Sequence, residues 1–190
     1  MITRHPMLAI LPALVFLAGC AQQRQVPQLQ HQLGQLNQQL QTLTNQATAL
    51  EQQNALNAQS TSGVYLLPAA QSRAILQSDI GQLGVSLSDI ESEANGSRAL
   101  LHIRTLDSAR LSAFSARLDW GQIDPVTGKP LPRDVQTQAF VFSPSLLPKA
   151  ETVIELRLSG LSPEQLGFVR LYHIAGQERT PPPVAAIEAP

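Results

Sequence analysis

Charge is scarce in this 190-residue chain: charged residues make up 14% of it, and 13 lysines and arginines stand against 14 aspartates and glutamates. Without Arg4, which belongs to the N-terminal segment considered below, 12 basic and 14 acidic residues leave a net charge of −2. Binding to nucleic acid or to anionic lipid relies on concentrated positive charge. We therefore expect no nucleic acid partner and no electrostatic attachment to lipid.

Cysteine and the usual catalytic motifs are also nearly absent. Cys20 is the one cysteine, so the chain cannot form a disulfide with itself. No serine lies in a G-x-S-x-G sequence and no histidine in H-E-x-x-H or H-x-H, while Gly81 and Gly84 are too sparse for a phosphate-binding loop. We therefore expect that the protein is not an enzyme and that it has no metal-binding or cofactor-binding residues.

The histidines leave one weaker alternative for chemistry. His31 lies in a polar, glutamine-rich segment, whereas His102 and His173 each fall in an expected strand. A pair of histidines that met across strands could bind a metal. Two surface histidines are the interpretation that we favour, because no two of them have ligand spacing.

Carboxylates and aromatics leave two further alternatives. Glu91 and Glu93 could form a carboxylate pair for sugar cleavage, but their place before Asn95-Gly96 is typical of a solvated strand end. Aromatic residues make up only 4% of the chain, and Trp120 is its one tryptophan. Because Trp120 alternates with Asp119, a core anchor is favoured over a sugar-binding platform.

The strongest positive feature is the N-terminal segment, which ends in Leu-Ala-Gly-Cys. This tetrapeptide resembles a bacterial lipobox, and the apolar stretch before it, residues 7–17, is too short to span a bilayer. We expect residues 1–19 to be a signal peptide cleaved between Gly19 and Cys20, with acyl chains such as palmitate on Cys20. An ordinary signal peptide, or an apolar core helix with an incidental cysteine, is the alternative. Since Ala21 follows the cysteine, resemblance to enteric lipoproteins implies the outer membrane, with the body in the periplasm.

Residues 21–59 are polar and almost uncharged, with 14 glutamines and only Arg24 and Glu51 as formal charges. Their apolar residues recur at heptad spacing, which is typical of a coiled coil. We call these eight residues the leucine seam: Val26, Leu29, Leu33, Leu36, Leu40, Leu43, Ala47 and Leu50. The pattern predicts a linker over residues 20–27 and a helix over residues 28–59, and it breaks at Asn54 and Asn57.

An isolated helix of this kind is marginal in water, so the leucine seam predicts a partner. The partner could be a second copy bound through residues 28–53, a different protein, or the chain's own domain. A partly ordered tether is the alternative. The flanking positions are nearly all glutamine, asparagine or threonine, so they cannot select the partner by charge pairing.

After a small-residue hinge at residues 60–63, the hydrophobic period changes from helical to two. Alternating apolar residues with turn signals between them predict short antiparallel strands. The expected strands cover residues 64–67, 74–77, 83–87, 101–103, 114–120, 135–142, 154–158 and 168–174. The fold class predicted is mainly β: an immunoglobulin-like sandwich over residues 63–176, without the usual cysteine pair, preceded by a long helix. A small closed barrel is the alternative, and the Pro/Ala-rich residues 177–190 are expected to be a flexible tail.

Three stretches together resemble the YajI-like family of enterobacterial lipoproteins: QQNALNAQSTSGVYLLPAA at 52–70, IGQLGVSL at 80–87 and LSPEQLGFVRLYHI at 161–174. The resemblance covers most of the chain after Cys20, apart from the proline-rich tail. It implies a lipid-anchored envelope protein whose shared domain has no assigned function, and it carries over no catalytic residue.

The sequence therefore predicts a non-enzymatic envelope lipoprotein. Its lipid would fix it to the membrane, its helix would act as a coiled-coil spacer, and its sandwich would bind an envelope protein or peptidoglycan. Two alternatives stay open. One is an enzyme or accessory factor that acts on peptidoglycan with unrecognised catalytic residues; the other is a periplasmic carrier of a metal or small ligand.

Overall fold

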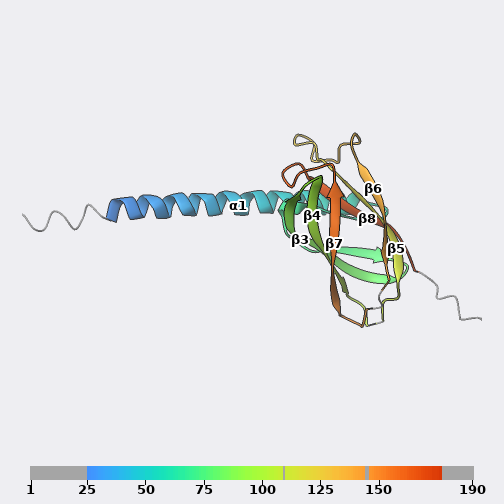
Figure 1. Cartoon of the computed structure of the whole chain (residues 1–190). Coiled ribbons are helices and arrows are strands. Elements are labelled where there is room, and N and C mark those ends of the chain that lie inside the picture. Colours follow the sequence, from blue (N-terminus) through green and yellow to red (C-terminus); the bar gives the residue numbers. More distant parts are fainter. Residues whose placement is uncertain (1–24, 109, 144–145, 177–190) are drawn as a thin grey trace, which may run out of the picture. The chain divides into compact units, whose positions relative to one another are not determined.

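The computed structural model describes residues 25–108, 110–143 and 146–176. Within them lie one long helix, α1 (Gln25–Gln59), a short 3-10 helix, η2 (Pro68–Ala70), and eight strands (Figure 1). The strands are β1 (Val64–Leu66), β2 (Ala74–Ser78), β3 (Gly81–Glu93), β4 (Gly96–Thr105), β5 (Phe114–Gly121), β6 (Gln136–Phe142), β7 (Glu151–Ser159) and β8 (Phe168–Gly176). The predicted signal peptide, with Gly19 and Cys20, and the predicted tail lie outside the described residues.

The chain forms two compact units, residues 1–44 and residues 45–190, and α1 continues across their boundary. We call the described part of the second unit the body; it contains the last turns of α1 and all the strands. The predicted helix over 28–59 is present, and it begins at Gln25, so that Pro27 falls in the first turn, where helices tolerate proline. No helix in the described part of the chain is both long enough and apolar enough to cross a membrane.

The strands pair into two antiparallel sheets of four strands each. Sheet A has the order β1-β8-β5-β6 and sheet B the order β2-β3-β4-β7. Figure 1 shows β3, β4 and β7 side by side in one layer, with β8, β5 and β6 in the other. The prediction of a mainly β fold with an N-terminal helix is confirmed, and the two sheets replace the closed-barrel alternative.

The immunoglobulin-like assignment itself stays a prediction. Constant-type immunoglobulin sandwiches divide their strands as A-B-E-D and C-F-G, so that no three consecutive strands are neighbours in one sheet. Here β2, β3 and β4 are consecutive in the chain and adjacent in sheet B. The body therefore shares the two-layer architecture of that fold, while this part of its topology is a meander.

The core lies between the sheets and follows from the period-two pattern of the strands. In β4, residues alternate between buried and half-buried along the whole strand. Ala99, Leu101 and Ile103 point inward and are fully buried, while Arg98 and His102 point outward. Large side chains from both sheets complete this core, among them Leu66, Leu83, Val85, Phe114, Leu158, Val169 and Leu171.

Strand β3 is longer than the sequence pattern predicted. It extends from Gly81 to Glu93, whereas the alternation predicted residues 83–87 only. The pairing of β3 with β4 shifts between Ser88 and Glu91, and Asp89 has a left-handed φ of 47°. A β-bulge of this kind adds residues to one strand and breaks the alternation. The sequence signal therefore ends at the bulge, although the strand continues beyond it.

The last turns of α1 pack on the body through a face that the leucine seam did not predict. Ala49 and Gln53 are buried, and Leu56 packs against a small cluster around Phe168. Ala47 and Leu50, the last two members of the leucine seam, are exposed. The seam prediction left the partner of these two residues open, so their exposure on this chain does not contradict it. The docked face of the helix, however, is offset from the seam.

Two polar side chains fix this docked end of the helix. The Gln53 side chain accepts a hydrogen bond from the Leu67 backbone N–H at 2.8 Å and donates one to the Ser72 hydroxyl at 2.9 Å. Asn57 accepts from the Tyr65 N–H at 2.7 Å and donates to the Tyr65 carbonyl at 3.0 Å. The Asn57 side chain therefore bonds both backbone polar groups of Tyr65 in β1, as the backbone of a neighbouring strand would. The predicted break in the heptad pattern at this asparagine marks a change of partner rather than the end of the helix.

Trp120 tests the core that these strands build. Its side chain is 3% exposed, and its Nε1 donates a hydrogen bond to the Ser159 carbonyl of sheet B at 3.0 Å. We expect Trp120→Ala to lower the free energy of unfolding by about 3–5 kcal/mol, because it leaves a large cavity and removes this bond. Urea unfolding of the chain from Ala21 onward measures the loss, with Trp120→Phe as a variant that should lose less. An unchanged midpoint for Trp120→Ala would contradict a buried role.

Candidate functional site

The outer face of sheet B joins three polar side chains that are far apart in the sequence. The Ser88 Oγ lies 2.8 Å from Nε2 of His102, and Nδ1 of His102 lies 3.2 Å from Oε1 of Glu151. We call Ser88, His102 and Glu151 the polar triplet. They come from β3, β4 and β7, which are neighbours in sheet B. The hydroxyl, the imidazole and the carboxylate therefore form one continuous hydrogen-bonded chain.

The strand register explains why these side chains meet. His102 pairs with Ser86 on one side and with Val153 on the other. Ser88 and Glu151 are each two residues from those partners and point to the same face, so both are diagonal neighbours of the imidazole. Arg73 completes the chain with an ion pair to Glu151 at 3.0 Å.

Gly84 makes room for that arginine on the sheet. A Cβ at Gly84 would lie 2.7 Å from Cδ of Arg73, so the arginine side chain crosses the strand where there is no side chain. Gly84 and Gly81 both belong to β3. Gly81 has a left-handed φ of 120° where the preceding turn meets the strand, and Gly84 leaves space for Arg73.

The β-bulge changes the surroundings of Ser88. Its hydroxyl also lies 2.8 Å from Oδ2 of the adjacent, exposed Asp89. The single hydroxyl proton thus has two acceptors within reach, the carboxylate and the imidazole. Asp89 and Ile90 have no regular pairing partner on β4, so the ladder is interrupted directly after the serine.

A groove of about 710 Å³ opens beside the bulge, within the body. Its apolar wall includes Leu67, Leu87 and Leu166, and Ser88 and Asp89 lie at its edge. This volume lies in the range of sites that hold small molecules. Ser88, at one end of the polar triplet, therefore also lines a groove large enough to admit a ligand.

The groove is bordered by negative charge. Glu164 lines it together with Asp89, and none of its lining residues is a lysine, arginine or histidine among those that the structure describes. The Ser162 hydroxyl donates a hydrogen bond to Glu164 at 2.7 Å, which lowers the pKa of that carboxyl. Glu164 thus stays ionised at neutral pH, and the groove disfavours anionic ligands.

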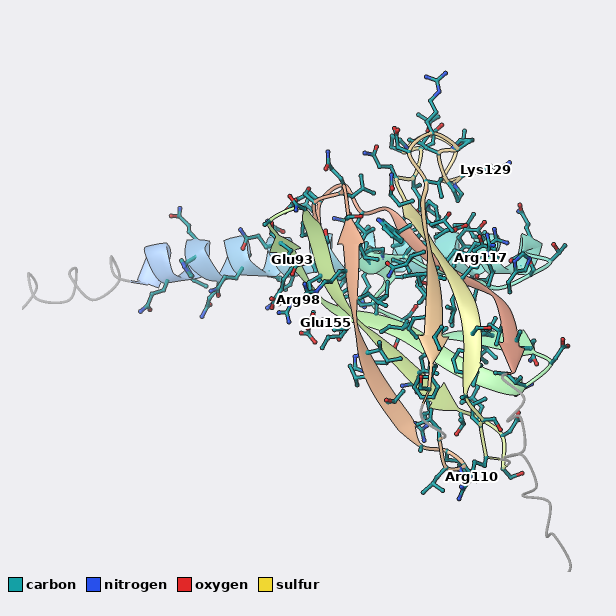
Figure 2. The ribbon with its side chains drawn as sticks, turned by 45° about the vertical axis from the view of Figure 1, so that its right-hand side comes forward. Glu93, Arg98, Arg110, Arg117, Lys129 and Glu155 are labelled. Atoms are coloured by element: carbon teal, nitrogen blue, oxygen red, sulfur yellow. The ribbon has the colours of Figure 1, made fainter. Side chains whose placement is uncertain are left out.

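A network of ion pairs occupies the end of sheet B near the β3–β4 turn. Arg98 binds Glu91 and Glu155, and the hydrogen bonds to these two carboxylates raise its pKa. Figure 2 shows Glu93, Arg98 and Glu155 gathered at this end of the sheet. Arg157 completes the network with Glu155 at 3.4 Å and Glu93 at 3.8 Å. Glu91 and Glu93 are thus partners of arginines at a strand end, and the sugar-cleaving alternative gains no support from their positions.

Sheet A presents a different outer face, centred on Arg170. Its guanidinium lies over the rings of Tyr65 and Tyr172, 5.0 Å and 4.8 Å from their centroids. One terminal nitrogen donates to the Ser62 carbonyl at 2.8 Å, whereas the buried Nε has no hydrogen-bond partner in the described residues. Lys129 and Tyr65 line a pocket of about 420 Å³ beside it. Because the C-terminal end of α1 also borders this pocket, the two cations offset the negative end of the helix dipole.

The three histidines and Trp120, which the sequence analysis considered as candidates, lie in separate parts of the structure. His102 faces out from sheet B, while His173 lies in sheet A against Tyr172, so the two histidines do not meet and the paired-histidine metal site is wrong. His31 is exposed on α1. Within the described ranges, histidine, cysteine and acidic side chains form no group of three that could hold a metal. Trp120 is buried, as a core anchor should be.

The leucine seam is exposed along α1. Five leucines of the seam are more than half exposed: Leu29, Leu33, Leu36, Leu40 and Leu43. Val26 belongs to the helix, and its side chain lies outside the described residues, as do Gly19 and Cys20. A stripe of exposed leucines on a polar helix is a surface that favours association.

The sequence patterns did not reveal the polar triplet. His102 lies 14 residues from Ser88 and 49 residues from Glu151, so no local motif connects the three. One weak signal was available: His102 occupies an outward position of a predicted strand, and Ser88 directly follows another predicted strand, residues 83–87. The register that brings them together depends on the β3–β4 and β4–β7 pairing, which alternation alone does not fix.

The stability of the His102→Ala variant tests whether the polar triplet stabilises the folded state. If His102 and His173 were only surface histidines, as the sequence favoured, His102→Ala and His173→Ala would both be tolerated. The structure instead predicts a loss of about 1 kcal/mol for His102→Ala, because two side-chain hydrogen bonds disappear. His173→Ala should stay within about 0.5 kcal/mol, since His173 is exposed and only stacks on Tyr172. Urea unfolding of both variants makes the comparison, and equal stabilities would contradict it.

Comparison with known proteins places this architecture in a family. Residues 20–186 match the family described as protein of unknown function (DUF3251). The chain is 40% identical over 167 residues to an uncharacterized lipoprotein, YajI, of Escherichia coli strain K12, covering 88% of this chain and 93% of the relative. The solution structure of YajI from E. coli aligns with 72% of this chain and 83% of its own, at 37% identity and a TM-score of 0.65.

A second solved structure, the trimeric lipoprotein SadB of Salmonella enterica, has a similar fold. It aligns with 86% of this chain and 83% of its own, with a TM-score of 0.52 and 23% identity. The family match and the E. coli relative each cover most of the chain. The chain therefore belongs to the YajI-like lipoprotein family, whose shared domain is the protein of unknown function DUF3251.

Proposed function

We propose that this protein is an outer-membrane lipoprotein whose Cys20 is acylated and whose body faces the periplasm. The lipobox and the short apolar stretch before it support the anchor. The family match begins at Cys20, and both relatives described above carry lipoprotein in their names. The alanine that follows the cysteine supports the outer membrane over the inner membrane. In this arrangement no membrane-spanning helix is needed, because two or more acyl chains anchor a protein stably.

The helix would serve as a spacer through which copies of the chain associate. The exposed leucine seam carries this proposal, because it is the longest stripe of unpaired apolar side chains on α1. SadB is described as a trimeric lipoprotein, which supports an assembly of three chains. A shared membrane would hold all the N-termini on one side, so the helices would associate in parallel. The bodies would then be displayed together toward an envelope protein or peptidoglycan.

A second candidate function is supported by the polar triplet beside its groove. The sequence analysis left open an enzyme or accessory factor that acts on peptidoglycan with unrecognised catalytic residues, and the polar triplet supports an enzyme without naming its substrate. Ser88, His102 and Glu151 have the residue types and the distances of a nucleophile, a base and an orienting carboxylate. The carrier alternative has no comparable observation in its favour.

Lipid attachment is tested at Cys20. We expect Cys20→Ser to leave an unprocessed precursor or a protein released from the membrane, because a hydroxyl does not replace the thiol in acylation. Membrane fractionation with mass spectrometry of the N-terminus measures this. Ala21→Asp is the matched variant: it keeps the acylated cysteine and should shift the protein to the inner membrane. Recovery of a processed Cys20→Ser protein with outer membranes after a high-salt wash would contradict the anchor.

Self-association is tested on the leucine seam. Leu36→Asp with Leu43→Asp should abolish the oligomer of the chain from Ala21 onward, because burying two charges in an apolar seam costs several kcal/mol. Gln38→Asp with Asn45→Asp adds the same charges at the same spacing on the opposite side of the helix and should leave the oligomer intact. Sedimentation equilibrium gives the masses. An unmutated chain that stays monomeric at high micromolar concentration would contradict the proposal of self-association.

A further inference from the structure

We propose that Ser88 is the nucleophile of an ester-hydrolysing site, with His102 as its general base and Glu151 as the residue that positions the imidazole. The inference rests on the second candidate function above and names its residues and substrate class. Three independent observations carry it: the hydrogen-bonded polar triplet, the groove at the serine, and the bulge that follows the serine in β3.

The distances match the roles. A nucleophile and its base lie within about 2.6–3.2 Å in known triads, and the base is held in turn by a third group. Ser88 and His102 are 2.8 Å apart, and His102 and Glu151 are 3.2 Å apart. Glu151 is itself held by Arg73 at 3.0 Å. Because an ionised carboxylate only accepts hydrogen bonds, the proposed roles place the hydrogen of the neutral imidazole on Nδ1, which donates to Glu151, and leave Nε2 to accept the serine proton.

In the proposed site the bulge supplies hydrogen-bond donors for the oxyanion, which a triplet on a regular flat sheet would lack. The carbonyl oxygen of an ester becomes negative during attack and needs hydrogen-bond donors close to the nucleophile. Asp89 and Ile90 directly follow Ser88, at the register shift where regular pairing with β4 is interrupted. The backbone N–H after a nucleophilic serine is a donor that other hydrolases use. We assign these two amides as the donors to the oxyanion.

The reaction balances with water as the only co-substrate. Ser88 Oγ attacks the ester carbonyl carbon, and its proton passes to Nε2 of His102. The C–O bond then breaks, and the alcohol leaves with that proton, so that an acyl group remains on Ser88. Water attacks the acyl carbon and gives a proton to His102. The carboxylic acid leaves, and Ser88 takes its proton back from His102.

The groove selects the class of ester. Leu67, Leu87 and Leu166 provide an apolar wall, while Asp89 and Glu164 add negative charge without a lining cation among the described residues. An anionic substrate would be repelled, because both carboxylates lie along the groove. The site is therefore suited to a short acyl ester of a neutral or positively charged alcohol.

Asp89 controls how reactive the serine is. Its carboxylate competes with His102 for the Ser88 proton, since both acceptors lie 2.8 Å from the Oγ. A serine that donates to Asp89 is not activated by the imidazole. Removing that charge should therefore make Ser88 more reactive. Stability alone would not predict this result, because Asp89 is exposed.

A fluorophosphonate probe tests the proposal on the full-length protein in isolated cell envelopes, with the labelled peptide identified by mass spectrometry. We expect covalent labelling at Ser88, lost completely in Ser88→Ala. His102→Gln should slow labelling by about 100-fold or more, and Glu151→Gln should slow it less. Asp89→Asn should increase it.

The matched control is Ser86→Ala, on the same face of β3 and directly opposite His102. It should label at the unmutated rate, because no hydrogen bond joins Ser86 to the triplet. The purified protein should also hydrolyse p-nitrophenyl acetate with the same ranking of variants. Absence of probe at Ser88, or equal labelling in His102→Gln, would overturn the inference.

The same experiment separates this inference from the proposal of a lipid-anchored assembly. Leu36→Asp with Leu43→Asp should lose the oligomer yet label at Ser88 as before, because the seam does not border the groove. A chain that is lipidated and oligomeric but not labelled at Ser88 would contradict the ester-hydrolysis inference and leave the assembly proposal intact. A chain that is labelled but stays monomeric would contradict the assembly proposal and leave the ester-hydrolysis inference intact.

Discussion

The buried side chain of Gln53 is the interaction on which the arrangement of the body depends. It is 1% exposed, and it holds the backbone N–H of Leu67 and the hydroxyl of Ser72 at once. A buried amide without partners would cost about 1–3 kcal/mol, so these two bonds fix one rotation of α1 against the sheets. That rotation turns Ala49 and Gln52 toward the groove and Asn57 toward β1.

The same bond to Leu67 shapes the wall of the groove. Leu67 precedes η2, and Leu67, Pro68, Ala69 and Gln71 line the groove together with residues of the β3 bulge. The helix end, η2 and the bulge thus form one rim, although α1 and β3 are far apart in the chain. Gln53 does not touch the polar triplet. It acts on the site by fixing the surface against which a ligand at Ser88 would lie.

Local periodicity and turn signals located the helix and each strand but not their full extent, because the alternation of buried residues depends on each segment alone. Strands β3 and β4 both extend beyond their predicted ranges. Leu101 and Ile103, for example, needed no knowledge of their neighbours to be assigned to a strand. The polar triplet needed that knowledge, since His102 meets Ser88 only through the β3–β4 register. The docked face of α1 was missed for a related reason: Gln53 is polar, and a buried glutamine leaves no hydrophobic signal.

The leucine seam raises a last question, which is how a coiled coil without charge pairs would choose its orientation. Its flanking positions are almost uncharged, so they favour neither parallel nor antiparallel helices. In the proposed arrangement the membrane makes this choice. An acylated Cys20 would hold each helix by its N-terminal side, which would exclude the antiparallel pairing. Confinement to a surface would also raise the effective concentration of the seams, so that a modest affinity would be enough for assembly. In this proposal the anchor and the seam depend on each other: the lipid would supply orientation and proximity, and the leucines would supply contact.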